Sequence, residues 1–240
     1  MPDGFGDLPP VSMDNPQSIQ DYKDMTDGWF ATTGGHEVYK DSIQWCDTRE
    51  EKIPAQYGND VEGKVLIHTP KSIKGSKGNV AFIDVHSGGC IAGSPELNKA
   101  FCCYTALNNC ALVFNPKYRL AGSGATADQM ASDIVALVKW IRAKAMFLGV
   151  DPNKICLHGC SGGGYAVAAA CSKLALANEG HLIKLTIMNC ASDPAYYIKT
   201  PKSQMPIHIR DAYFCTPFIA HAYATNFDQQ WADKDPVLLP

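Results

Sequence analysis

The feature that most constrains this 240-residue chain is an apolar run that leads through a glycine-rich turn into a helical pattern. Residues 155–158 are predicted to form a strand, and residues 162–178 are predicted to form a helix whose small side chains allow close approach to a sheet. Between them lies the pattern G-x-S-x-G, at residues 159–163. In this context the turn is so tight that side chains two residues to either side of Ser161 would collide with the neighbouring strand or helix. Glycine removes the collision, so Ser161 is expected to project above the sheet edge.

The rest of the chain alternates short apolar runs with helical patterns, which indicates an α/β fold with a mostly parallel, doubly wound sheet and helices on both faces. The runs that predict strands are residues 65–68, 80–85, 111–114, 155–158 and 185–188. The later runs are so continuously apolar that we expect them in the middle of the sheet.

Three helices are predicted in addition to the one after Ser161. A weakly amphipathic stretch at residues 16–30 predicts a short helix, and Ser94 followed by Pro95 is expected to open another. The clearest helix begins at the capping box of Thr126 and Gln129, and Gly149 stands just past its end.

Composition excludes several classes of protein. With 46% hydrophobic and 19% charged residues, the chain suits one globular domain with a continuous core. A net charge of -3 and no Lys/Arg run argue against a nucleic-acid partner. No segment reads as a secretion signal or a membrane span, so a cytoplasmic location is expected.

The ten cysteines are interpreted as reduced. Four of them sit in apolar runs, where free cysteine behaves as a small buried hydrophobe: Cys110, Cys156, Cys171 and Cys190. No C-x-x-C pair occurs, and adjacent Cys102 and Cys103 are poorly placed to share one ion. We therefore expect no metal site.

A second glycine-rich motif follows the predicted strand at residues 80–85. His86-Ser-Gly-Gly89 leaves backbone N–H groups exposed to a ligand. Together with the amide of Gly162, the residue after the expected nucleophile, they would surround the oxygen of a tetrahedral intermediate. Each such donor is worth roughly 2.7–4 kcal/mol of barrier. An ordinary glycine-rich turn is the competing interpretation of either motif taken alone.

With both motifs in view, the chain resembles the hormone-sensitive-lipase-like carboxylesterase branch of the α/β hydrolases, whose members carry an HGGG loop and a GDSAGG elbow. Here the loop reads HSGG and the elbow GCSGGG, and residues 115–121 are similar to the family's Y-R-L-A segment. Ser87 replaces the family's first glycine, and Cys160 replaces its acidic residue before the serine. Neither departure removes an oxyanion donor.

The resemblance implies an α/β-hydrolase fold with a helical cap, and it implies roles for five residues. Ser161 would be the nucleophile, Gly88, Gly89 and Gly162 would form the oxyanion hole, and His86 would orient the loop. Residues 1–40 are rich in Pro, Asp and Gly and are interpreted as a peripheral or cap segment. The resemblance implies a hydrolase core at 41–194, and an aromatic cap insertion with the start of the return to the core at 195–240.

By the same alignment, the acid and the histidine of the triad lie beyond Pro240, and the last two strands of the sheet are absent. The 240 residues are therefore expected to be nearly inactive, as a fragment, a truncated record or a degenerate relative. A complete triad inside the chain would need Asp193 as the acid and His208 or His221 as the histidine. His68 and His158 sit within predicted strands and are interpreted as core or edge residues.

The function implied by the resemblance is cleavage of small to medium acyl esters through an acyl-enzyme on Ser161, with no cofactor. Nothing in the motifs separates ester from amide, so an amide or formamide hydrolase stays open. The alternative from another class is a non-catalytic protein that binds a small molecule on a hydrolase scaffold. The oligomeric state is open, with a homodimer as one option.

Overall fold

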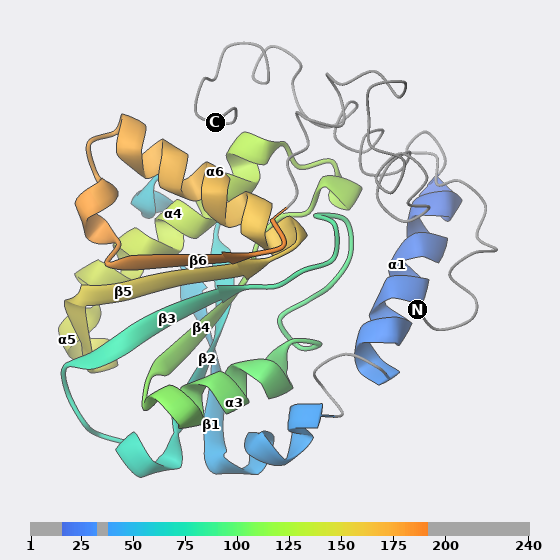
Figure 1. The fold of residues 1–240 in the computed structure, drawn as a ribbon. Coiled ribbons are helices and arrows are strands. Elements are labelled where there is room, and N and C mark those ends of the chain that lie inside the picture. Colours follow the sequence, from blue (N-terminus) through green and yellow to red (C-terminus); the bar gives the residue numbers. More distant parts are fainter. Residues whose placement is uncertain (1–15, 33–37, 192–240) are drawn as a thin grey trace.

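The described part of the chain forms a layered α/β structure. The structure is a computed structural model that describes residues 16–32 and 38–191 (Figure 1). The predicted N-terminal helix is α1, Pro16–Thr32. The division of the chain at residues 40 and 194 stays a prediction.

Six strands form one sheet in the described part of the chain, in the order β1-β2-β4-β3-β5-β6. Their bounds are β1 Cys46–Ile53, β2 Gly63–Pro70, β3 Asn79–Val85, β4 Leu112–Lys117, β5 Val150–Cys160 and β6 Leu185–Asn189. β1 and β2 pair antiparallel, as do β2 and β4, whereas β4, β3, β5 and β6 run parallel. The mostly parallel sheet expected from the sequence is confirmed.

Helices cover both faces of this sheet. α4 (Ala127–Ala143) and α6 (Gly162–Leu176) pack against each other on one face, over β5 and its neighbours. α3 (Lys99–Asn109) packs on the opposite face, over β2 and β4 (Figure 1). The larger hydrophobic core lies on the α4 and α6 face, and a smaller one around Cys103 and Val113 lies on the α3 face.

The predicted capping box is confirmed at the start of α4. Thr126 Oγ1 accepts a hydrogen bond from the Gln129 backbone N–H at 3.2 Å, and the Gln129 side chain accepts one from the Thr126 N–H at 3.0 Å. Buried apolar residues then follow at helical spacing, among them Met130, Ile134 and Ile141. α4 ends at Ala143, and Gly149 instead ends the separate short helix α5, Ala145–Leu148.

Two further expectations about the elements are wrong, and one strand was not expected. The helix expected from Ser94 begins only at Lys99, because residues 94–98 form a turn in which the Leu97 N–H donates to Ser94 Oγ. β6 is the outer strand of the described sheet, with Leu185 51% exposed, although continuous apolar character predicted a central place. β1 was not predicted, because its middle is charged and only its end residues, Cys46 and Ile53, are buried.

The expectation that cysteines in apolar runs are buried is also wrong in part. Cys110 and Cys190 are exposed, and Cys156 and Cys171 are only half-buried. All nine cysteines in the described residues are free thiols. The exposed pair lies just past element ends, where backbone direction rather than local hydrophobicity sets burial: Cys110 caps α3 and Cys190 follows β6.

Candidate active site

The turn between β5 and α6 consists of one residue, Ser161. β5 ends at Cys160 and α6 begins at Gly162, so the chain reverses direction at the serine. Its backbone has φ 52° and ψ -121°, a strained conformation for a residue with a side chain. The Ser161 N–H donates to the Asn189 carbonyl at 2.8 Å, and the Ser161 carbonyl accepts from the Tyr165 N–H at 3.1 Å. The turn is therefore held from β6 on one side and from α6 on the other.

The two outer glycines of the G-x-S-x-G pattern are required by space. A Cβ on Gly159 would lie 2.3 Å from the Gly163 carbonyl oxygen, inside α6. A Cβ on Gly163 would lie 2.1 Å from the Val85 carbonyl oxygen, at the end of β3. Both distances are far below van der Waals contact, and both partners are backbone. The collisions predicted from the sequence are confirmed at these two positions.

The loop after β3 carries the second glycine motif. Gly88 has φ 124°, and a Cβ there would lie 2.0 Å from the Ala92 carbonyl oxygen. Its own carbonyl accepts from the N–H groups of Ile91 and Ala92, at 3.0 and 2.9 Å. Gly89 follows with φ 60°. These left-handed conformations fold the loop into a compact turn beside the end of β3.

The glycine loop and the serine turn touch through their backbones. A Cβ on Gly162 would lie 2.5 Å from the Cys90 amide nitrogen and 3.0 Å from Gly89 Cα. The Cys90 thiol also donates to the Gly162 carbonyl at 3.2 Å. Gly89 and Gly162, from motifs 73 residues apart in the sequence, are thus neighbours at the carboxyl ends of β3 and β5. Ser161 and Gly88 each lie one residue from this contact.

The electrostatics at the turn favour negative charge. Ser161 stands at the N-terminus of the 15-residue helix α6, where unpaired N–H groups and the helix dipole create a positive potential. Burial raises the pKa of the neighbouring Cys160 thiol, so this side chain is neutral near pH 7. An anion that develops beside Ser161 therefore meets amide groups and no adjacent thiolate.

His86 lies beneath the glycine loop and is buried. Its Nδ1 is 2.8 Å from the Ser87 carbonyl oxygen, and its own carbonyl accepts from the Tyr118 hydroxyl at 2.9 Å. Burial lowers the pKa of His86, because the charged imidazolium would lose its hydration. Gly93 packs on the imidazole ring, and the Gly93 N–H donates to Asp27 of α1 at 3.0 Å. These contacts tie His86 and α1 to the loop.

This arrangement can be compared with known proteins. A family model described as "alpha/beta hydrolase fold" matches residues 82–240, which include both motifs. The chain belongs to the α/β-hydrolase fold family.

Relatives and solved structures agree with this assignment. The chain is 26% identical over 126 residues to carboxylesterase 1E of Mus musculus, a match that spans 50% of this chain and 22% of the mouse protein. It resembles the solved structure of a Pyrobaculum calidifontis esterase, with a TM-score of 0.72 at 18% identity, covering 93% of this chain and 69% of that one. A brefeldin A esterase, described as a bacterial homologue of human hormone sensitive lipase, has a TM-score of 0.71 at 16% identity, covering 98% and 68%. The expected resemblance to hormone-sensitive-lipase-like carboxylesterases is confirmed.

The histidines in the described part of the chain do not supply an evident base for Ser161. His68 is fully buried on β2, where its Nδ1 lies 3.0 Å from Thr48 Oγ1. His158 is buried on β5 and bonded to Asp84, and His181 is exposed in the turn that precedes β6. The expected core positions of His68 and His158 are confirmed. Asp193, His208, His221 and the aromatic segment at 195–240 lie outside the described residues.

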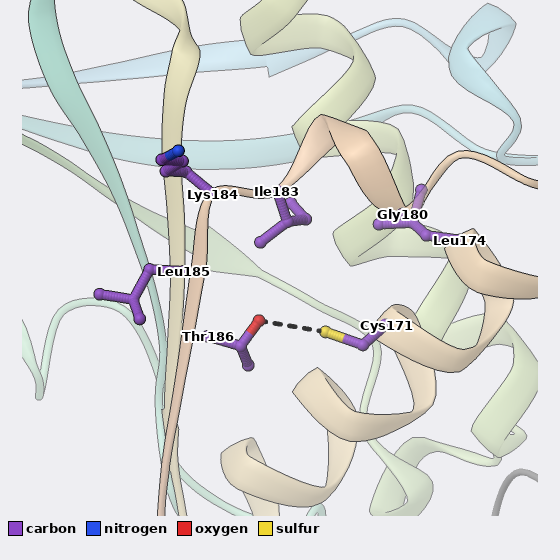
Figure 2. Close-up of a pocket in the computed structure, with 7 residues that line it drawn as sticks. All are labelled: Cys171, Leu174, Gly180, Ile183, Lys184, Leu185 and Thr186. Atoms are coloured by element: carbon purple, nitrogen blue, oxygen red, sulfur yellow. Dashed lines mark hydrogen bonds between the residues drawn. The ribbon is translucent and has the colours of Figure 1, made fainter.

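Two hollows that are lined by described residues lie away from the serine turn. One, of about 210 Å³, lies between α6 and the start of β6, where Cys171 Sγ is 3.5 Å from Thr186 Oγ1 (Figure 2). Another, of about 620 Å³, lies around Met146, Gly149 and Val150 at the amino end of β5. Ligands of parallel α/β sheets bind at the carboxyl ends of strands, so neither hollow is the expected substrate site.

The described residues contain neither a membrane-spanning helix nor a metal cluster. No helix among them is long and apolar enough to cross a bilayer. No group of three or more His, Cys, Asp or Glu side chains among them has the geometry to hold a metal ion.

Four residues near the site were not predicted from the sequence: Asp84, Cys90, Tyr118 and Asn189. Cys90 directly follows the glycine pair, and Tyr118 lies in the segment similar to Y-R-L-A, so both stood beside recognised motifs. Asp84 could have been noticed in the sequence, because it is an acidic residue near the end of an otherwise apolar strand. Asn189 had no signal, because its contacts come from strand pairing alone.

Proposed function

We propose that this chain is the nucleophile-bearing part of a carboxylic ester hydrolase in which Ser161 attacks the substrate carbonyl. The attack forms a tetrahedral intermediate whose oxyanion accepts hydrogen bonds from the amides of Gly88, Gly89 and Gly162. Collapse of the intermediate expels the alcohol and leaves an acyl group on Ser161, which water then releases as the acid.

One observation carries this proposal: the strained serine turn lies in backbone contact with the glycine loop. Gly162 is so close to Cys90 and Gly89 that no side chain fits between them. Such strain persists only where the surrounding structure enforces it, and it clusters at active sites. The names of the relatives, which include a carboxylesterase and esterases, support an ester as the substrate class.

The finer parts of the proposal concern substrate and proton transfer. We expect small to medium acyl groups, with the aromatic residues of 195–240 lining the acyl pocket. The histidine that accepts the Ser161 proton is sought outside the described residues, because His68, His86 and His158 are buried in other contacts. Without it, the chain retains only the residual catalysis of binding and oxyanion donors, on the order of 10⁶ below a complete triad. A cytoplasmic location belongs to the same proposal.

The test uses covalent labelling and hydrolysis. The chain is incubated with a fluorophosphonate probe and with p-nitrophenyl acetate, butyrate and octanoate, beside a Ser161→Ala variant. A Ser132→Ala variant is the matched control, since Ser132 is an ordinary helical serine that donates to the Asp128 carbonyl in α4. We expect slow labelling of the unaltered chain and of Ser132→Ala, at the residual rate that remains without the triad base, and no labelling of Ser161→Ala. Equal labelling of Ser161→Ala would overturn the proposal.

Two extensions of this experiment separate the open alternatives. A p-nitroanilide series distinguishes an amide hydrolase, which would cleave anilides at rates comparable with esters. Binding of these small esters without labelling or hydrolysis would favour the non-catalytic binding protein. His208→Ala and His221→Ala variants test a base inside the chain, because loss of labelling in one of them would identify it.

A further inference from the structure

A buried polar group lies beneath the serine turn, on the sheet face opposite α6. Asp84 of β3 and His158 of β5 are direct register partners, one rung before the last pair of these two strands, Val85 and Gly159. Asp84 is 1% exposed and His158 is 7% exposed. His158 Nδ1 and the Asp84 carboxylate form a hydrogen bond. This pair joins the strand that leads to the glycine loop with the strand that leads to Ser161.

The Asp84 carboxylate is held from a third direction by α3 and the turn before it. The Asn98 amide donates to Asp84 Oδ2, and the Cys102 thiol donates to the same oxygen at 3.4 Å. A buried carboxylate is stable only when donors replace its lost water. Three donors from separate elements meet this need and fix the carboxylate in place, which in turn fixes the orientation of the His158 ring.

The second ring nitrogen of His158 connects the pair to the serine turn. The Asn189 side-chain amide donates to His158 Nε2, with the nitrogens 3.3 Å apart. The backbone carbonyl of the same residue accepts the Ser161 N–H at 2.8 Å. A continuous chain of hydrogen bonds therefore runs from Asp84 through His158 and Asn189 to the backbone of Ser161.

We propose that Asp84, His158 and Asn189 are positioning residues that set the placement of Ser161 relative to the glycine loop. His158 holds its proton on Nδ1, toward the carboxylate, and accepts at Nε2 from Asn189. The three side chains thereby lock the carboxyl ends of β3, β5 and β6 together at the point where all three strands pass into the site. This inference rests on the proposed function of Ser161 for its consequence in catalysis.

The same contacts exclude His158 as the base for Ser161. Both of its ring nitrogens are already bonded, one to Asp84 and one to Asn189. The ring also packs between Phe82 and Phe101, with centroids 5.7 and 5.9 Å away, on the α3 face of the sheet. Its role is to hold the backbone in place, and a misplacement of about 1 Å at a reacting centre can cost about 100-fold in rate.

The test compares two variants with matched controls. Asp84→Asn removes the charge of a buried carboxylate. Its control is Asp133→Asn, which removes the charge of another buried carboxylate: the Asp133 side chain, on α4, is 9% exposed and lies 2.8 Å from the Arg119 guanidinium. Asn189→Ala removes the side-chain donor but keeps the carbonyl that binds Ser161, and Met188→Ala is its neighbour on the same exposed strand. Each variant is examined for unfolding by urea and for the rate constant of labelling by the fluorophosphonate.

We expect both aspartate variants to lose stability, while only Asp84→Asn and Asn189→Ala lower the maximal labelling rate, by about 10-fold to 100-fold. The dissociation constant for reversible binding of the probe should stay within about twofold of that of the unaltered chain, because the glycine loop is intact. A labelling rate in Asp84→Asn within about twofold of Asp133→Asn would overturn the inference, since the group would then be structural only.

A second readout does not depend on activity. In ¹⁵N NMR spectra we expect His158 to carry its proton on Nδ1, and the amide signals of Ser161 and Gly162 to move in Asp84→Asn and Asn189→Ala but not in the two controls. If the unaltered chain is labelled no faster than Ser161→Ala, the proposed function fails, and these NMR signals alone decide the positioning role. Unmoved Ser161 and Gly162 signals, or a proton on Nε2, would overturn it.

Discussion

The backbone contact between Gly162 and the glycine loop can be tested by adding one methyl group. In Gly162→Ala the new Cβ would lie 2.5 Å from the Cys90 nitrogen and 2.9 Å from the Gly89 carbonyl carbon. Both neighbours are backbone atoms, so the loop itself must move. Gly162 does not have a positive φ, so the perturbation is one of space rather than of backbone conformation.

The expected magnitude follows from this geometry. Forcing an extra methyl into a packed backbone contact costs about 1–3 kcal/mol. For a domain of this size, about 2 kcal/mol corresponds to a fall of about 4–8 °C in the midpoint of thermal unfolding. Displacing the loop also moves oxyanion donors, and loss of one such donor costs about 10²–10³ in turnover.

The assay pairs thermal unfolding with fluorophosphonate labelling, and Gly180→Ala is the matched control. A Cβ on Gly180 has no atom within 4 Å, and its φ is not positive, so this substitution should leave both the unfolding midpoint and the labelling rate nearly unchanged. If Gly162→Ala matches Gly180→Ala in both measurements, the loop and the serine turn are not in contact, and the oxyanion hole built on that contact is wrong.

Three further predictions follow from the local geometry. Because glycine tolerates the φ of 52° at position 161, Ser161→Gly should be more stable to urea than Ser161→Ala by about 1 kcal/mol, and equal stability would mean that the turn is unstrained. Burial lowers the pKa of His86 in the folded chain, so below about pH 6.5 the unfolded state binds a proton that the native state does not, and stability falls as pH falls toward the native pKa. Between pH 7.5 and 5.5, the free energy of unfolding of His86→Gln should therefore fall less steeply than that of the unaltered chain. The two slopes should differ by up to about 1.4 kcal/mol per pH unit, and identical slopes would contradict this. Thr126→Ala breaks the capping box of α4 and should cost about 1 kcal/mol by urea unfolding without changing the labelling rate, whereas an unchanged stability would show that the cap contributes nothing.

Local patterns predicted most of the elements and the chemistry of the motifs. The capping box at Thr126 and the glycines at 159 and 163 could be interpreted from sequence, because their reasons are local: a hydrogen bond three residues along, or a collision inside one tight turn. Element boundaries were less accurate where the backbone interacts with distant residues. α3 begins at Lys99 rather than near Ser94, and Asn98, which immediately precedes it, uses its side chain to bind Asp84.

The amino-acid sequence by itself determined that a strand, a one-residue turn and a helix would present Ser161, because only glycine fits two residues before and two residues after the serine. It also determined which backbone donors were available in the loop after β3. Tertiary structure alone decided that Gly89 meets Gly162 and that Asp84, His158 and Asn189 join three strand ends. These contacts arise from the register of parallel strands far apart in the chain, and that register is fixed only when the apolar face of each strand is buried in the packed sheet.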